Sequence, residues 1–273
     1  MKKIFIFLSF VVLSHISLQA QDTIKVLTHN VLAFSGYPKS KFITDTAIFN
    51  RAKEFYKNSK ADIIILQECP EIQYIKALAE YLNYNFKYFK PKYKGNETYP
   101  YGFPGCVLTK YPITDTLDFN GGMKKGADSI FQRHFGIVNI LTNKGKIQVT
   151  GLHLCADWGN KFRETTRLIE IDILQKTVLK CKDCFLQILA GDCNSIPGSI
   201  PINKILKMGY LDTYSAINWK TVPIPNPTVR IDYIFVKGNF KSFEPAPKEL
   251  PYFSDLQLYM SDHAPCISEI ILK

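Results

Sequence analysis

The stretch Asp62-Ile-Ile-Ile-Leu-Gln67 decides the class of the fold. Its four central residues are all apolar and do not alternate with polar ones, which is typical of a strand covered on both faces. A second run of the same kind, Phe185–Ala190, lies in the second half of the chain. Strands of this type occur in sheets that carry helices, so the sequence predicts an α/β protein.

The segments around the first apolar run alternate between strand and helix patterns. The residues of Ile24–Asn30 alternate in polarity, which predicts a strand, and Thr46–Asn58 has apolar residues at helical spacing. Glu71–Leu82 predicts a second helix, and the aromatic and basic segment Tyr84–Asn96 predicts a strand that leads into a loop. The first part of the chain is therefore expected to fold as β-α-β-α-β.

The rest of the chain contains further strands and two helices. Helices are predicted at Lys161–Leu179 and Pro201–Met208. Strands are predicted, in addition to Phe185–Ala190, at Cys106–Thr109, Ile113–Asp118, Phe131–Leu141, Lys146–His153, Arg230–Val236 and Pro265–Leu272. The two halves have similar construction and no low-complexity linker separates them, so we expect one domain.

The first twenty residues have the pattern of a secretory signal peptide. Lys2 and Lys3 precede the apolar run Ile4–Leu13, and small residues then offer a cleavage point before Gln21. The run is about half of the roughly 20 residues that a membrane-spanning helix needs, so we expect no membrane span. A buried N-terminal strand or helix is the alternative. We expect residues 21–273 to form the mature domain, in the periplasm or outside the cell.

The formal net charge of the chain is +10. Removal of residues 1–20, which carry two of the positive charges and no negative one, would leave +8. A basic excess of this size fits a polyanionic partner, and solvated lysines without a partner explain it equally well. We expect the protein to be a monomer.

The seven cysteines are an odd number, which does not indicate a disulfide framework. Cys181-Lys-Asp-Cys184 has the spacing of a zinc or redox pair, but no second ligand pair accompanies it. A single disulfide, or two unmodified thiols at the end of a helix, is the better interpretation. We expect four of the others to be small buried packing residues: Cys69, Cys155, Cys193 and Cys266.

Polar residues with useful chemistry follow or precede the predicted strands directly. Any one of them alone would usually be a turn or capping residue, but the pattern recurs along the whole chain. Strand ends gather at one edge of a sheet, so we expect these side chains to lie close together. They are Asn30, Glu68, His153, Asp192, Asn194, Asp232, Asp262 and His263.

This set of residues favours metal-assisted hydrolysis by water. Several carboxylates can hold a hard divalent cation, which takes oxygen ligands, and Glu68 is the best single candidate. The sequence has no Gly-x-Ser-x-Gly pattern for a serine nucleophile and no P-loop for a nucleoside triphosphate. An aspartate paired with a histidine would complete a general acid–base group or a stabiliser of the transition state.

Six short strings carry a resemblance to a known family. The strings, in order, are Thr28-His-Asn-Val31, Leu66-Gln-Glu-Cys69, Gly151-Leu-His-Leu154, Gly191-Asp-Cys-Asn-Ser195, Arg230-Ile-Asp-Tyr-Ile-Phe235 and Ser261-Asp-His-Ala-Pro265. With these strings the chain resembles the endonuclease/exonuclease/phosphatase superfamily, of which deoxyribonuclease I is a familiar member, over about residues 24–272. The resemblance implies a four-layer α/β sandwich, in which two mixed β-sheets pack face to face with helices outside.

The resemblance also implies roles for individual residues. Glu68 would bind the metal, with Asn30 and Asp262 in or near its coordination shell. The metal would be Mg²⁺, with Mn²⁺ or Ca²⁺ as alternatives. His263 would pair with Asp232, and Asp192 would orient or deprotonate the attacking water. Asn194 would hold a phosphate oxygen or that water, and His153 would donate to the phosphoryl group. Arg133 would contact the phosphate, or could instead be a surface charge. The resemblance leaves open whether Asp192 or His263 acts as the base.

The expected function is hydrolysis of a phosphate ester. A secreted phosphodiesterase acting on nucleic acid or on a phospholipid headgroup, as in sphingomyelinase-like relatives, is the leading hypothesis. A phosphomonoesterase that acts on inositol or sugar phosphates is a further enzymatic hypothesis. A binding protein that has kept the fold but lost turnover belongs to another class, and it would have no reason to keep Glu68, Asp192 and His263 together.

Overall fold

The computed structural model describes residues 23–91, 95–118, 133–156, 162–178, 181 and 183–273. The predicted signal peptide lies outside these residues, as do Phe131 at the start of one predicted strand and the two end residues, Lys161 and Leu179, of one predicted helix. No helix among the described residues is long and apolar enough to cross a membrane.

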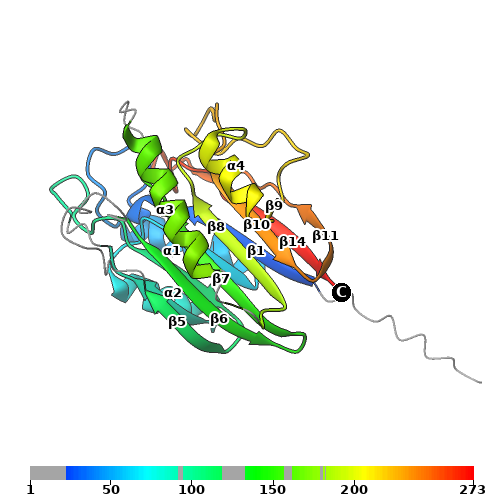
Figure 1. Ribbon diagram of the computed structural model, residues 1–273. Helices are drawn as coiled ribbons and strands as arrows, with labels where there is room; N and C mark the ends of the chain where they lie inside the picture. The colour runs from blue at the N-terminus through cyan, green and yellow to red at the C-terminus, as the bar shows by residue number, and fades with distance from the viewer. Residues whose placement is uncertain (1–22, 92–94, 119–132, 157–161, 179–180, 182) are drawn as a thin grey trace, which may run out of the picture.

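Two mixed six-stranded sheets form the body of the described structure (Figure 1). The first sheet has the order β11 (Phe240–Pro245), β14 (Cys266–Leu272), β1 (Thr23–Asn30), β2 (Ile63–Gln67), β4 (Gly105–Thr109) and β3 (Asn85–Phe89). The second has the order β5 (Ile113–Asp118), β6 (Phe135–Thr142), β7 (Gly145–His153), β8 (Leu186–Asp192), β10 (Asp232–Gly238) and β9 (Leu211–Asp212).

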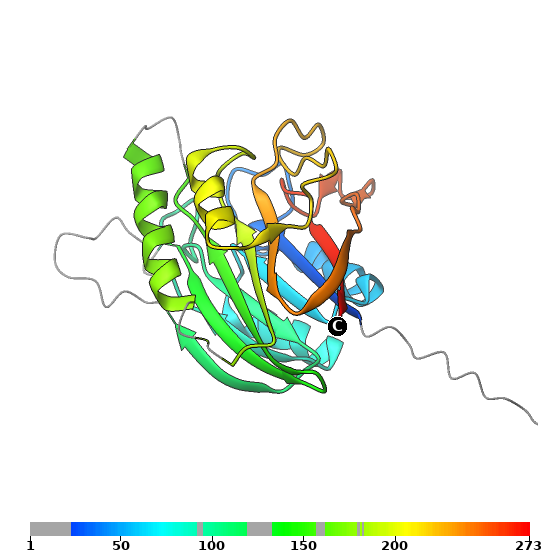
Figure 2. The same cartoon turned by 45° about the vertical axis from the view of Figure 1, so that its right-hand side comes forward.

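Helices cover the outer face of each sheet (Figure 2). Helices α1 (Thr46–Ser59) and α2 (Ile72–Leu82) pack on the first sheet. Helices α3 (Phe162–Val178) and α4 (Ile200–Lys207) pack on the second. A third apolar cluster fills the space between the two sheets. The predicted four-layer α/β sandwich is therefore confirmed.

The apolar run of β2 takes part in two of these clusters at once. Ile63 and Ile65 pack between the sheets, and Ile64 and Leu66 point to the opposite face, against α1 and α2. Successive side chains of a strand point to opposite faces, so a strand in this position must be apolar at every residue. Burial on both faces explains why Ile63–Leu66 are all apolar.

Strand directions bring the predicted site residues to one edge of the sandwich. β1 runs parallel to β2, and β7 runs parallel to β8, so the carboxyl ends of each pair lie side by side. β10 is antiparallel to β8 and β14 is antiparallel to β1, which places the beginnings of these two strands at the same edges. Residues that end four strands and precede two others can therefore converge.

Most predicted elements are present within one to three residues of their predicted bounds. The structure also contains four strands that we did not predict, namely β9, β11 and the small β12–β13 hairpin (Tyr252–Phe253 and Leu258–Tyr259). A short 3₁₀ turn, η1 (Leu32–Phe34), follows β1. Helix α1 begins where the Asp45 side chain accepts hydrogen bonds from the backbone N–H groups of Ala47 and Ile48.

Cys181 and Cys184 form a disulfide, which matches the single-disulfide interpretation. The four cysteines expected to be packing residues, namely Cys69, Cys155, Cys193 and Cys266, are buried and unpaired. Burial also raises the pKa of the Cys69, Cys193 and Cys266 thiols well above the ordinary value. These three thiols are therefore protonated and unreactive at neutral pH.

Candidate active site

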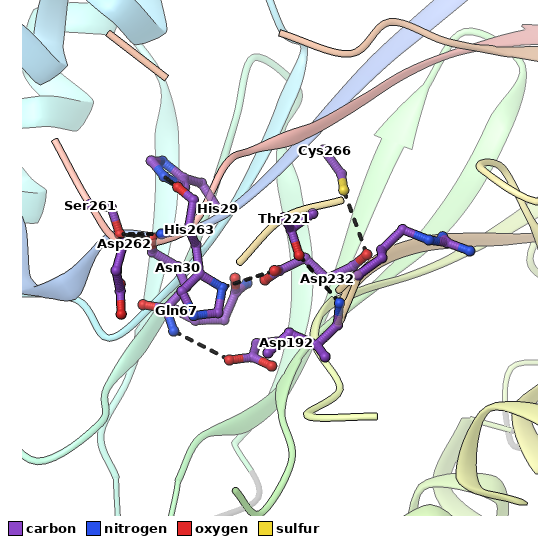
Figure 3. Close-up of polar contacts among 12 residues, drawn as sticks. His29, Asn30, Gln67, Asp192, Thr221, Asp232, Ser261, Asp262, His263 and Cys266 are labelled. Carbon is purple, nitrogen blue, oxygen red and sulfur yellow. Dashed lines mark hydrogen bonds and ion pairs between the residues drawn. The ribbon is translucent and has the colours of Figure 1, made fainter. Parts of the chain in front are cut away.

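Asn30 and Asp192 join the two sheets at the centre of the candidate site (Figure 3). Asn30 is the last residue of β1, in the first sheet, and Asp192 is the last residue of β8, in the second. The Asn30 side chain donates a hydrogen bond from Nδ2 to Asp192 Oδ2 at 3.3 Å, and both residues are buried. The site therefore depends on both sheets.

Asp232 and His263 form a buried pair beside Asp192 (Figure 3). His263 Nδ1 lies 2.8 Å from Asp232 Oδ2. Burial alone would lower the pKa of His263, but the charges of Asp232 and Asp262 outweigh it and raise this pKa well above the ordinary value. Asp232 is fully buried, and burial raises its own pKa. His263 is thus an imidazolium at neutral pH, held by a carboxylate.

Two buried residues that we did not assign to the site hold His263 in place. His29 Nε2 donates to the carbonyl oxygen of His263 at 3.0 Å, and its Nδ1 accepts from the Tyr56 hydroxyl at 2.8 Å. The Ser261 hydroxyl donates to the Asn30 carbonyl at 2.7 Å and accepts from His263 N–H at 3.3 Å. Each lies beside a predicted site residue in a quoted motif, and that adjacency was the available signal.

His153 and Arg133 lie against Asp192. His153 Nε2 is 3.2 Å from Asp192 Oδ2, and Arg133 Nη1 contacts the same imidazole nitrogen. Burial, with the charge of Arg133, lowers the pKa of His153 to about 4, so this imidazole is neutral at physiological pH. The imidazoles of His153 and His263 outweigh burial at Asp192 and hold its pKa below the ordinary value, so this carboxylate is ionised.

Arg133 belongs to the site by position. Its side chain is only 10% exposed, and its guanidinium carbon lies 4.2 Å from the centre of the Phe103 ring. Arg133 Nη1 is 3.7 Å from Glu68 Oε1. The alternative interpretation of Arg133 as an exposed strand charge does not describe this placement. A cation held over an aromatic ring at the edge of the site can contact an anionic oxygen.

Glu68 stands one residue beyond β2 in a left-handed backbone conformation, with φ at 50°. Burial raises the pKa of Glu68 to about 7, with Arg133 opposing the shift and Asp262 adding to it. The Asn30 side chain also hydrogen-bonds to Glu68. A carboxylate that is 12% exposed, with a second carboxylate and an amide beside it, offers the oxygen donors that a hard divalent cation prefers. The predicted metal ligands are thus close together, and they fit such an ion.

A second group of possible ligands lies deeper. Asp192, Asp232 and His263 offer ligand atoms within 4.8 Å of one another. However, a histidine must be neutral to bind a metal, and His263 is protonated and hydrogen-bonded to Asp232. Glu68, Asp262 and Asn30 are therefore the better metal-binding set, and the deeper group is better suited to acid–base chemistry.

Asn194, two residues beyond the end of β8, adopts a left-handed conformation with φ at 46°. Its backbone N–H donates to Asp192 Oδ1 at 2.8 Å, and its side-chain Nδ2 donates to the Leu154 carbonyl at 3.0 Å. The residue therefore orients the Asp192 carboxylate and leaves one amide hydrogen for another acceptor.

Arg230, which begins one of the quoted motifs, has a structural role. It is buried and forms a two-pronged ion pair with Asp212, at 2.9 and 2.6 Å. Its guanidinium carbon also lies 4.4 Å from the centre of the Tyr233 ring. This charge is thus neutralised beside the site rather than within it.

An α/β sandwich with buried carboxylates and histidines at one edge defines a class of hydrolases. Residues 27–263 match the endonuclease/exonuclease/phosphatase family, and the chain belongs to that family. Members of the family are hydrolases of phosphoester bonds. No curated protein matches the chain in sequence at a significant level.

Several solved structures share the fold at low sequence identity. SmcL is 18% identical, with a TM-score of 0.68 over 91% of this chain and 99% of its own. Truncated TDP2 of Caenorhabditis elegans is 14% identical, with a TM-score of 0.66 over 91% of this chain and 98% of its own. A family protein from Bacteroides thetaiotaomicron is 17% identical, with a TM-score of 0.64 over 92% and 98%. At this identity the similarity concerns the fold.

Proposed function

We propose that this protein is an exported, Mg²⁺-dependent phosphodiesterase in which water attacks phosphorus directly. The observation that carries the proposal is the arrangement of acidic and basic side chains around Asp192, which residues of both sheets contact. An ionised Asp192 lies beside a neutral His153 and the protonated His263, with Arg133 at the rim. Hydrolysis of a phosphate ester needs a group that orients water and cationic or hydrogen-bonding groups for the phosphoryl oxygens.

Asp192 orients and deprotonates the attacking water. Its carboxylate is ionised, and the Asn194 N–H and the Asn30 amide fix its direction. His263 is already protonated, so it is unsuited to act as a base and instead donates a hydrogen bond to a phosphoryl oxygen. The charge states therefore favour Asp192 as the base, a question that the sequence left open.

Arg133 and His153 donate hydrogen bonds to the remaining phosphoryl oxygens, and Asn194 donates its second amide hydrogen to the phosphate. Arg133 rests on the Phe103 ring, which limits its motion. A guanidinium positioned in this way supplies charge without reorganisation during the reaction. These residues bind and orient the phosphate, while Asp192 acts on the water.

Glu68, Asp262 and Asn30 would hold the divalent cation. When bound, the cation neutralises charge on the phosphate and acts as a Lewis acid. Oxygen donors favour Mg²⁺, with Mn²⁺ or Ca²⁺ as alternatives. Calorimetric titration of Mg²⁺ into wild type and Glu68→Gln tests this assignment, because unchanged Mg²⁺ affinity in the variant would remove Glu68 from the metal site.

A substrate panel tests the reaction itself. Residues 21–273 are assayed with Mg²⁺ on plasmid DNA, RNA, sphingomyelin, inositol phosphates and a small phosphodiester. We expect hydrolysis of at least one diester and loss of activity in EDTA. Activity confined to phosphomonoesters would replace the diesterase by a monoesterase, and binding without any turnover would indicate a non-catalytic relative.

Export is part of the proposal and rests on residues 1–20. Expression of the full chain in a bacterial host, followed by mass spectrometry of the periplasm and medium, tests it. We expect a mature N-terminus at Gln21, and retention of the uncleaved chain in the cytoplasm would contradict export. Size-exclusion chromatography of the mature chain is expected to give a monomer.

A further inference from the structure

Helix α3 packs on β7 and β8, and three of its polar side chains contact Cys155 (Figure 1). The Glu170 side chain accepts a hydrogen bond at Oε2 from the Cys155 N–H at 2.9 Å. Arg167 Nη1 donates to the Cys155 carbonyl at 2.9 Å, and Arg163 Nη1 lies 3.3 Å from the Cys155 sulfur. Cys155 follows His153 by two residues, so α3 holds the chain directly beside the candidate site.

Two of these helix residues are almost completely buried. Glu170 is 1% exposed and Arg167 is 4% exposed. Side chains of this kind are almost never buried to this extent unless they are paired, because their removal from water is costly. A helix that only had to cover the sheet could use apolar residues there, as α3 does at Ile171 and Leu174. The two polar side chains therefore serve the backbone that they contact.

Glu170 and Asn194 bind the same peptide group from opposite sides. The Leu154 carbonyl and the Cys155 N–H belong to one planar peptide unit, which is trans, so the two groups point in opposite directions. Glu170 accepts from the N–H, and Asn194 Nδ2 donates to the carbonyl at 3.0 Å. Rotation of this peptide plane would therefore move the acceptor that holds the Asn194 side chain.

The direction of the Asn194 amide depends on that acceptor. One hydrogen of Nδ2 is bound to the Leu154 carbonyl, and the amide group is planar, so the first bond also sets where the second hydrogen points. The backbone is held as well, because Leu154 N–H donates to the Asp192 carbonyl at 2.9 Å. The second amide hydrogen is the one that the proposed function gives to the phosphate.

We propose that Glu170 and Arg167 are positioning residues that aim the Asn194 amide at the phosphate through the Leu154–Cys155 peptide. Glu170 sets the tilt of this peptide, and Arg167 holds the carbonyl of the next one. The inference rests on the proposed function, in which Asn194 contacts the phosphate. A displacement of about 1 Å in a positioning group can cost about 100-fold in rate, so residues remote from the substrate can matter in this way.

Kinetics of Glu170 variants test the proposal on methyl 4-nitrophenyl phosphate with Mg²⁺. We expect Glu170→Leu, which removes the acceptor, to lower kcat by about 10- to 100-fold. Glu170→Gln keeps an acceptor of the same shape and should stay within about threefold of wild type. Glu170→Asp keeps the carboxylate but shortens its reach, so it should lose activity as well, and it carries the test if Glu170→Leu does not fold.

Leu174→Ala is the matched control, at a buried apolar residue one turn further along α3. It should lower the urea midpoint of unfolding but leave kcat of the folded protein unchanged. The affinity for Mg²⁺ should stay the same in all these variants, because Glu68, Asp262 and Asn30 lie outside the segment that Glu170 holds.

A double-mutant cycle shows whether Glu170 acts through Asn194. In an Asn194→Ala background the group that Glu170 positions is absent, so Glu170→Leu should lower kcat further by less than about twofold. A role confined to stability would give no such dependence on Asn194.

Nuclear magnetic resonance gives a readout that needs no turnover. The side-chain amide signal of Asn194, assigned by its loss in Asn194→Ala, is recorded in EDTA. We expect Glu170→Leu and Glu170→Asp to shift this signal, and Glu170→Gln and Leu174→Ala to leave it close to its wild-type position.

An unshifted Asn194 signal in Glu170→Leu and Glu170→Asp would overturn the proposal, as would equal losses of kcat with and without the Asn194 side chain. Inactivity of wild type on every diester would instead remove the proposed function. The amide signal would still decide whether Glu170 positions Asn194.

Discussion

At the scale of single residues, the candidate site separates its ionisable groups by their surroundings. His263 touches the Asp232 carboxylate and stays protonated, while His153 faces Arg133 and stays neutral. Desolvation, with the charge of Asp262 adding to it, raises the pKa of Glu68 to about 7. Two imidazoles with the same intrinsic chemistry thus have different protonation states because of their neighbours.

Removal of the carboxylate that holds His263 should reduce catalysis strongly. We expect Asp232→Asn to lower kcat by about 10²–10⁴-fold, because the imidazolium loses its counter-charge. Its pKa should fall, so the residual activity should decline between pH 6 and 8, a decline that wild type does not show. The pH profile of kcat measures this, and Asp255→Asn, at a surface pair with Arg51, is the control. Normal activity of Asp232→Asn would rule out the pair.

Buried neutral histidines should make the protein less stable in acid. Burial lowers the pKa of His29 from 6.5 to about 3, so below pH 6.5 the unfolded chain binds a proton that the folded chain does not. The free energy of unfolding should therefore fall by about 1.4 kcal/mol per pH unit for this residue as the pH drops from 6.5. Urea denaturation between pH 7 and 4 should give a shallower slope for His29→Gln than for wild type. Equal slopes would contradict a neutral His29.

At the scale of elements, the sequence predicts the strands that are buried on both faces, and it misses the exposed edge strand β11 and three strands of two residues each. β2 and β8 are mostly apolar and almost fully buried, as strands covered on both faces are. β11 lies at the edge of its sheet and is mostly exposed, and β9, β12 and β13 have two residues each. Such segments are defined by tertiary pairing, which leaves no periodic signal in the sequence.

The site follows the same division. Asn30, Asp192 and the other site residues at strand ends could be predicted, because the end of an apolar strand is visible in the sequence. His29 bonds to the backbone carbonyl of His263, which is 234 positions away in the sequence. Ser261 bonds to the backbone carbonyl of Asn30, which is 231 positions away. No local pattern encodes contacts between such distant residues. The placement of Arg133 against Phe103 is likewise a product of tertiary packing.

Packing between the sheets supports the site at β4. His134 is buried, stacks on Phe89 with ring centres 6.5 Å apart and lies edge-on to His153 at 6.2 Å. A Cβ at Gly105 would overlap the His134 ring. We expect Gly105→Ala to reduce the free energy of unfolding by about 1–3 kcal/mol in urea titrations.

A second variant separates this steric effect from a general loss of stability. Gly105→Ala should be partly rescued by His134→Ala, which removes the obstructing ring. Gly198→Ala, where a Cβ has no neighbour within 4 Å, should not be rescued by His134→Ala. Full additivity of Gly105→Ala and His134→Ala would show that the two residues do not interact.

At the scale of the whole molecule, the packing of the two sheets against each other brings the site residues together. Each sheet contributes residues that would be ordinary turn positions alone, and the hydrogen bond from Asn30 to Asp192 joins them across the interface. The apolar cluster between the sheets sets their separation, and thereby the distance between Glu68 on one side and Asp232 on the other. The catalytic arrangement therefore requires the complete fold.

The most direct test of the account is kcat of residues 21–273 on a phosphodiester with Mg²⁺, measured for wild type and His263→Ala on folded protein. The account predicts that wild type turns over, that EDTA abolishes the reaction, and that His263→Ala reduces kcat by about 10²-fold or more. Complete inactivity of the wild type, or full activity of His263→Ala, would contradict it.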